Sequence, residues 1–102
     1  MRYAVSRPYI VPESLAELAG PTSGVVKLPA HLDWSEQHVY DLGDPAQAGL
    51  MYERVIREAS SSRDLAAYLN AGMLDRLWNR LYLPPQVRRL WESRFPGLVR
   101  AA

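Results

Sequence analysis

Large apolar residues recur with helical spacing in the C-terminal third of the chain. One set occupies positions i, i+3, i+4 and i+7, which predicts an apolar stripe along an α-helix: Leu74, Leu77, Trp78 and Leu81. A second set follows the break at Leu83-Pro84-Pro85: Val87, Leu90, Trp91, Phe95 and Leu98. Two amphipathic helices with so short a connection predict an αα-hairpin with Trp78 and Trp91 in its core.

A further helix is predicted over residues 44–59. Asp44 can cap free backbone amides, Pro45 suits the first helical position, and Gln47 stands where a capping box places its glutamine. Its buried side is predicted to be Ala48, Met51, Tyr52, Val55 and Ile56. The serines at 60–62 end it, with Ser61 or Ser62 capping the next helix at Asp64. That helix is expected to run to Tyr82 with a kink or a break at Gly72.

The N-terminal part is predicted to be extended or β-containing. Residues 1–12 carry Pro8 and Pro12, which suit an extended arm or an edge strand. Residues 13–19 can form a short helix with Leu15 and Leu18 facing inward. The best strand candidate is residues 24–28, which are β-branched at Val25 and Val26, and residues 38–42 could pair with it as a hairpin.

Size and composition indicate one mainly α domain, with an extended or β-containing cover at 1–43 and a helical core at 44–98. The chain has 102 residues, of which 48% are hydrophobic. Its formal net charge of +1 gives no bulk attraction for nucleic acid or an anionic membrane. The absence of cysteine excludes disulfides and thiolate chemistry, and it favours a cytoplasmic location. No apolar run approaches the roughly 20 residues of a membrane span.

Few residues suggest chemistry. His31, Asp33 and His38 can all ligate a metal, but their spacing fits neither one helix face nor a known ligand motif, so ordinary loop positions are the expectation. Neither histidine accompanies a strained nucleophile turn, and no glycine-rich phosphate loop is present. We therefore expect no catalytic set, no cofactor and no metal.

Six arginines flank the tryptophan stripes: Arg76, Arg80, Arg88, Arg89, Arg94 and Arg100. They form either a solvated helix face, balanced in part by Asp75 and Glu92, or a surface that recognises carboxylate or phosphate. A helix-turn-helix over residues 64–83 would leave few polar residues free on its second helix. Direct DNA binding is therefore not expected.

Aromatic residues also occur in the predicted N-terminal cover. Trp34 follows a proline-containing loop and is either a core plug, which we favour, or an interface anchor. Tyr3, Tyr9 and Tyr40 belong to the same half and could cover the helices or a partner.

With these residues in view, the chain resembles a group of small actinobacterial proteins found beside nucleotidyltransferase-like toxins of the abortive-infection type. The similar segments span roughly residues 9–98: Gly24-Val25-Val26-Lys27-Leu28-Pro29, Leu32-Asp33-Trp34-Ser35, Tyr40-Asp41-Leu42 with Asp44-Pro45, Tyr52-Glu53, Asp64-Leu65 with Tyr68-Leu69-Asn70, Leu77-Trp78, Leu83-Pro84, Val87-Arg88 with Trp91-Glu92, and Phe95-Pro96. The resemblance implies an antitoxin-like or regulatory partner protein. Larger antitoxins of that class carry a winged helix-turn-helix, which this sequence lacks.

The expected function is therefore non-enzymatic protein binding. An antitoxin-like module would neutralise a nucleotidyltransferase-type toxin, encoded next to it, by occluding it; the alternative is a DNA-binding transcriptional regulator. The candidate partner-binding residues are Trp34, Tyr40, Arg76, Arg80, Arg88, Arg89 and Glu92.

Overall fold

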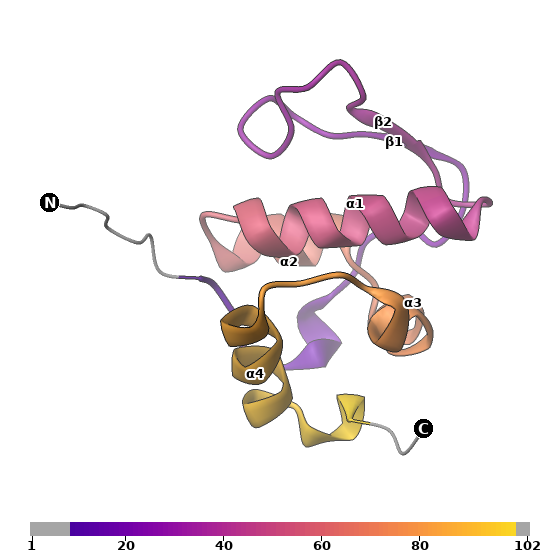
Figure 1. Cartoon of the computed structure of the whole chain (residues 1–102). Helices are drawn as coiled ribbons and strands as arrows, with labels where there is room; N and C mark the ends of the chain where they lie inside the picture. The colour runs from indigo at the N-terminus through magenta and orange to yellow at the C-terminus, as the bar shows by residue number, and fades with distance from the viewer. Residues whose placement is uncertain (1–8, 100–102) are drawn as a thin grey trace, which may run out of the picture.

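Helix α1, Pro45–Glu58, lies at the centre of the molecule, between a β-hairpin on one side and helices α3 and α4 on the other (Figure 1). The computed structural model describes residues 9–99. The other elements are η1 (Leu15–Glu17), β1 (Val25–Lys27), β2 (Val39–Asp41), α2 (Ser62–Tyr68), α3 (Ala71–Leu77), η2 (Trp78–Arg80), α4 (Pro85–Arg94) and η3 (Pro96–Leu98). The chain is thus mainly helical, with a small antiparallel sheet. Within residues 9–99 no helix has the length and apolar character needed to cross a bilayer.

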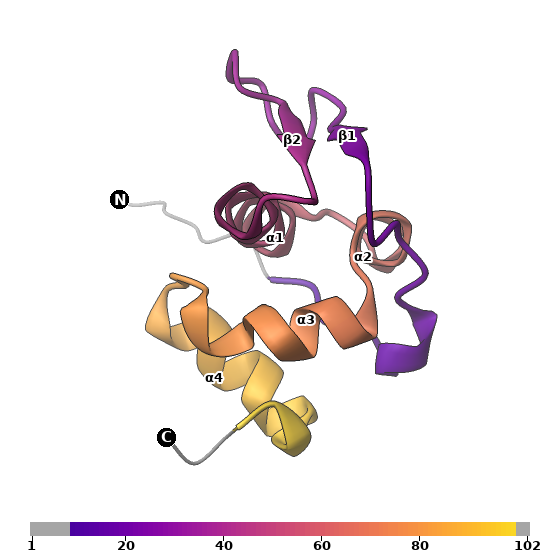
Figure 2. The ribbon, with the colours of Figure 1, turned by 90° about the vertical axis from the view of Figure 1, so that its right-hand side faces the viewer.

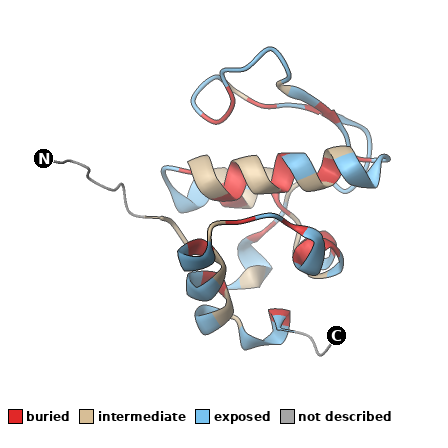
Figure 3. Cartoon of the chain, in the orientation of Figure 1, coloured by how far each residue is buried: buried red, intermediate tan, exposed pale blue. Residues whose placement is uncertain are grey.

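The start and the buried face of α1 are as predicted. Asp44 Oδ1 accepts a hydrogen bond from Ala46 N at 3.0 Å, and Pro45 is the first helical residue. Gln47 departs from a capping box, because its Oε1 accepts from the backbone N–H of Asp41. The buried residues of α1 are those expected: Ala48, Met51, Tyr52, Val55 and Ile56. Figure 3 shows buried and exposed positions alternating along the helix, so that α1 is amphipathic.

The predicted β-hairpin is confirmed. β1 and β2 pair antiparallel, with Val26 opposite Tyr40. Both of these side chains are buried, while the residues on either side of them in the strands face solvent. One face of the hairpin therefore covers the helical part and joins a single hydrophobic core with it.

The C-terminal helices meet through their tryptophans. Trp78 and Trp91 have no exposed surface, as predicted, and their ring centroids are 6.1 Å apart. Leu90 was expected in the same stripe, yet it is 42% exposed. The helical stretch also ends at Arg80 rather than Tyr82, and Leu81 is already extended.

The break between α2 and α3 lies earlier than predicted. Leu69 is extended, and Asn70 caps α3 by accepting a hydrogen bond from Met73 N at 3.0 Å, so Gly72 lies inside the first turn of α3. The N-terminal segment crosses this break, where Gly20 N donates to Leu69 O at 2.8 Å. A Cβ on Gly20 would lie 2.5 Å from the carbonyl carbon of Tyr68, so only glycine fits there.

Two N-terminal predictions need comment. Residues 13–19 form one 3-10 turn, Leu15–Glu17, instead of a two-turn helix. Leu18 is buried as expected. The arm predicted at residues 1–12 lies largely outside the described residues, as does Tyr3. Its last part, including Tyr9, packs against the core.

Replacing Trp78 with alanine is expected to destabilise the protein by about 3–5 kcal/mol, because a large buried aromatic leaves a cavity. Thermal unfolding measures the effect, and the midpoint should fall sharply. Trp34→Ala is the matched control, since Trp34 is 69% exposed and its loss should leave the midpoint nearly unchanged. Equal midpoint losses in the two variants would contradict the assignment of core and surface.

Replacing Asp44 with alanine should cost about 1 kcal/mol, because Ala46 N then loses its capping acceptor. Amide exchange should quicken at residues 46–49 at the start of α1. Glu36→Ala, in the loop between the strands, is the control. Unaltered protection of the first turn of α1 in Asp44→Ala would show that the cap does not stabilise it.

Candidate partner-binding surface

The loop between β1 and β2 is fastened to α1 through a buried carboxylate. Asp33 is 2% exposed, and its Oδ1 accepts hydrogen bonds from Ser35 N at 3.0 Å and Ser35 Oγ at 2.5 Å. Its Oδ2 accepts from the Tyr40 hydroxyl at 2.5 Å, and the Nε of Arg54 on α1 lies 3.9 Å from Oδ1. We call these four residues the Asp33 network. It satisfies a charge that burial would otherwise make costly.

A second contact ties the same loop to α2. His31 Nε2 lies 2.9 Å from Asp64 Oδ1, and the other oxygen of Asp64 accepts from Ser60 N at 3.0 Å. The predicted serine cap does not form, because the Ser61 side chain makes no capping bond, and Asp64 instead holds Ser60 just ahead of α2. The loop is thus held against two helices.

Protonation in the Asp33 network follows from its contacts. Burial raises the pKa of the Asp33 carboxyl, but hydrogen bonds from Ser35 and Tyr40 and the charge of Arg54 outweigh it, so the net pKa is lowered. Burial, together with the hydrogen bond to Asp33 and its charge, raises the pKa of Tyr40 to about 12. At neutral pH the network therefore pairs a carboxylate with a protonated phenol.

Trp34 projects outward from this fastened loop. Its side chain is 69% exposed, and the guanidinium carbon of Arg54 lies 5.7 Å from its ring centroid. The expectation that Trp34 plugs the core is therefore wrong. Its neighbour Asp33 takes the buried position instead, and the ring rests beside a cation that favours its π face.

The outer face of α1 continues the surface that begins at Trp34. Leu50 is 51% exposed and shares a hollow with Arg54 and Glu53. Glu53 Oε2 accepts from Tyr82 N at 2.7 Å, which holds the backbone of Tyr82 beside α1, and the Tyr82 residue is 83% exposed. We call this set the α1 surface: Trp34, Leu50, Glu53, Arg54, Arg80 and Tyr82.

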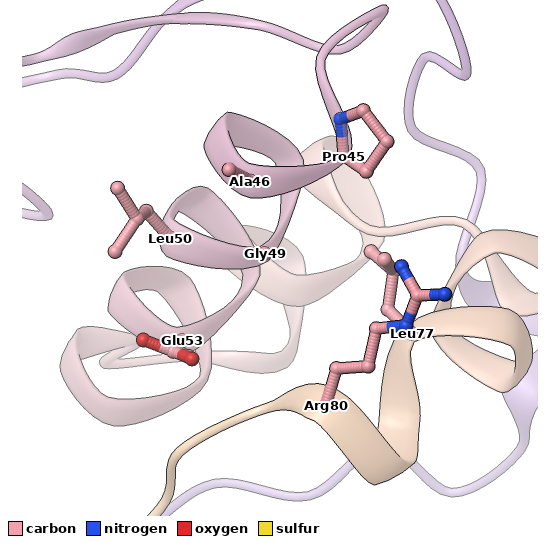
Figure 4. A pocket seen from close by; sticks show the side chains of 7 residues that line it. All are labelled: Pro45, Ala46, Gly49, Leu50, Glu53, Leu77 and Arg80. Atoms are coloured by element: carbon pink, nitrogen blue, oxygen red, sulfur yellow. The ribbon is translucent and has the colours of Figure 1, made fainter.

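Arg80 borders a groove at the N-terminal half of α1 (Figure 4). The hollow has a volume of about 270 Å³ and is lined by Pro45, Ala46, Gly49, Leu50, Glu53, Leu77 and Arg80. Figure 4 shows the Arg80 side chain reaching from η2 past Leu77 toward Pro45. A second hollow of about 300 Å³ is also lined by Pro45, Leu77 and Arg80, and it includes Arg76.

Three predicted partner-binding residues have internal roles instead. Trp78 Nε1 donates to Glu92 Oε2 at 2.8 Å, and Arg88 Nη2 donates to the carbonyls of Trp78 and Leu81 at 3.2 and 2.5 Å. The Arg88 guanidinium also lies 4.8 Å from the Trp78 ring centroid. Tyr40 is 4% exposed. Tyr40 is therefore buried rather than part of an exposed surface, and Arg88 and Glu92, which keep part of their side chains exposed, bond to neighbours within the fold.

The other three predicted partner-binding arginines, Arg76, Arg80 and Arg89, are exposed but lie on two separate parts of the surface. Arg76 and Arg80 border the hollows described above, on the side of α3 that meets α1. Arg89 is exposed on α4, and Figures 1 and 2 show this helix on the far side of the molecule from the β-hairpin. The single arginine cluster expected from sequence is thus divided.

The candidate metal residues do not converge. His31 contacts Asp64, Asp33 belongs to its own network, and His38 Nδ1 lies 3.1 Å from Glu36 O. Among residues 9–99 no group of three side chains is placed to hold a metal ion.

Sequence reasoning missed Leu50, Glu53, Arg54 and Tyr82. Leu50 could have been found, because a large apolar residue opposite the predicted buried stripe of a helix is left to solvent. Glu53 and Tyr82 meet only through the tertiary fold, so no local pattern marks them.

No protein-family model, no curated protein and no solved structure matches this chain. The α1 surface and the arginines near it are therefore the structural ground for a functional proposal.

Asp33→Asn should destabilise the protein by about 2 kcal/mol at neutral pH, because hydrogen bonds to a charged acceptor are lost. The pKa of Asp33 is lowered in the folded state, so its contribution is present above the unfolded pKa of about 4 and is lost as pH falls through the folded pKa. The unfolding free energies of wild type and Asp33→Asn should therefore converge in acid. Ser35→Ala, which removes a hydroxyl donor to the same carboxylate, should reduce the difference in unfolding free energy between neutral pH and acid. A difference for Asp33→Asn that stays constant from neutral pH to acid would contradict the network.

Proposed function

We propose that this protein is a non-enzymatic binding module that neutralises a nucleotidyltransferase-type toxin by occluding it. The observation that carries the proposal is the exposed Trp34, held in place by the Asp33 network. Tryptophan, tyrosine and arginine are the residue types most enriched at energetic centres of interfaces. A side chain fixed before binding loses less conformational freedom when the partner arrives.

The arrangement of the α1 surface supports a protein partner. The surface exposes three large side chains, Trp34, Leu50 and Tyr82. Two charged residues lie near them: Arg54 beside the Trp34 ring, and Glu53, which accepts from the backbone of Tyr82. Apolar anchors interspersed with charges are typical of interface centres with polar surroundings. A partner that covers this face would gain the hydrophobic burial that the isolated chain forgoes.

The type of partner follows from the family resemblance described above. A nucleotidyltransferase binds a triphosphate and an acceptor, so a protein seated over that cleft silences it without any chemistry of its own. Occlusion needs only a surface with rigid anchors. Glu92, a predicted partner-binding carboxylate, accepts from Trp78 and pairs with Arg88. The α1 surface is therefore the face we assign to the toxin.

The regulator alternative has less support. As the second helix of a helix-turn-helix, α3 would read base edges, but Met73, Leu74 and Leu77 are buried among its seven residues. Asp75 adds a negative charge to what remains. Few side chains are left to donate to bases.

The test is co-expression with the product of the adjacent gene, which the proposal expects to be a nucleotidyltransferase, followed by size-exclusion chromatography and affinity measurement. We expect a stable complex, and Trp34→Ala should weaken it about 30-fold or more, which corresponds to the roughly 2 kcal/mol of an interface hot spot. Val25→Ala is the matched control, because Val25 is also 69% exposed but lies on the outer side of β1.

A mobility-shift assay on the promoter, at physiological salt, runs beside it. A shift at nanomolar concentration together with no complex would replace this proposal with the regulator.

A further inference from the structure

The groove beside Arg80 contains a glycine that the fold does not require. Gly49 lies in the middle of α1, where glycine is less stable than alanine by about 1 kcal/mol. A Cβ there would meet only Leu81 Cδ2, at 4.0 Å, which is an ordinary contact. Gly20 differs, because a Cβ there would overlap the backbone of Tyr68. The missing side chain at Gly49 therefore leaves a hollow open at some cost to the helix.

The groove also has an available positive charge. Within residues 9–99 the exposed Arg80 makes no hydrogen bond or ion pair, although its side chain lies along the groove (Figure 4). Glu53, the carboxylate on the other wall, already accepts from the backbone of Tyr82. The groove thus offers a free guanidinium beside an apolar hollow formed by Gly49, Leu50 and Leu77. Arginine donates in a planar fork that matches a carboxylate.

The size of the groove limits what can occupy it. Its volume of about 270 Å³ lies below the range of roughly 300–1,000 Å³ typical of small-molecule pockets. An apolar side chain of a partner fits this description better than a complete metabolite. A nucleic-acid backbone is disfavoured, because it carries a charge at every nucleotide, whereas the hollow is largely apolar and has Arg80 as the one arginine among the described residues that line it.

We propose that this groove docks a segment of a protein partner in which an apolar side chain stands next to an aspartate or glutamate. The apolar side chain fills the hollow over Gly49, and the carboxylate pairs with Arg80. This inference rests on the proposed binding function. It states which part of the α1 surface contacts the partner and which partner residues that part selects.

The first test uses the full chain as bait for a displayed library of random peptides. We expect enriched peptides to share an apolar residue adjacent to Asp or Glu. Changing that acid to its amide, or changing Arg80→Glu, should weaken binding about 10- to 100-fold, as expected for a charge-assisted hydrogen bond. Arg63→Glu, an exposed arginine on α2, is the charge control.

Gly49 variants test the hollow separately. Gly49→Leu should reduce peptide binding more than tenfold by filling the groove, and Gly49→Ala should reduce it less while the thermal midpoint stays the same or rises. Gly97→Ala is the control, because a Cβ there meets nothing within 4 Å. No enriched peptide, a consensus without an acid, or binding unaffected by Gly49→Leu would overturn the inference.

The same variants separate this inference from the proposed function. A toxin complex weakened by Trp34→Ala but indifferent to Gly49→Leu and Arg80→Glu would overturn the groove and leave the function standing. Selected peptides that require Gly49 and Arg80, in a protein that forms no complex with the nucleotidyltransferase, would support the groove and reject the toxin as partner. Tighter binding of a single-stranded oligonucleotide than of any peptide, lost in Arg80→Glu, would also overturn it.

Discussion

Burial of one face of α1 is the constraint on which the rest of the structure depends. Met51, Tyr52 and Val55 have no exposed surface, because β2 and α2 contact α1 directly and α3 and α4 lie on the side of α1 away from the β-hairpin. Tyr52 also links α1 to the break between α2 and α3, since its hydroxyl accepts a hydrogen bond from Asn70 N at 2.9 Å. A domain of this size has little stability to spare, so these contacts dominate its fold.

The same constraint creates the candidate binding surface. A helix covered on its apolar sides must leave the opposite face to solvent, and on α1 that face holds Gly49, Leu50, Glu53 and Arg54. Gly49 lowers the stability of the helix relative to alanine, and Leu50 leaves apolar surface exposed to solvent.

The charged residues divide into two groups that do different work. Glu92 accepts a hydrogen bond from the Trp78 indole, and Arg88 donates to the carbonyls of Trp78 and Leu81, so both charges satisfy polar groups next to the core. Asp33 does the same for the loop, and it fixes Trp34 on the outside as a consequence. Arg80, in contrast, has no partner within residues 9–99 and remains available to another molecule. A charged residue in this sequence can therefore be assigned to a binding surface only after its contacts within the fold are known.

Local chemistry in the sequence determined the elements. The Asp44-Pro45 cap, the 3.6-residue apolar period of α1 and the β-branched pair Val25-Val26 each act over a few residues, so their outcomes could be predicted without the fold. Tertiary structure alone decided which tryptophan is exposed, that Tyr40 and Arg88 turn inward, and that the helix breaks at Asn70 rather than Gly72. Those outcomes depend on partners 7 to 18 positions away, such as Asp33 for Tyr40, Trp78 for Arg88 and Tyr52 for Asn70. Residue spacing carries no record of such pairs, because they form only when distant segments are packed together.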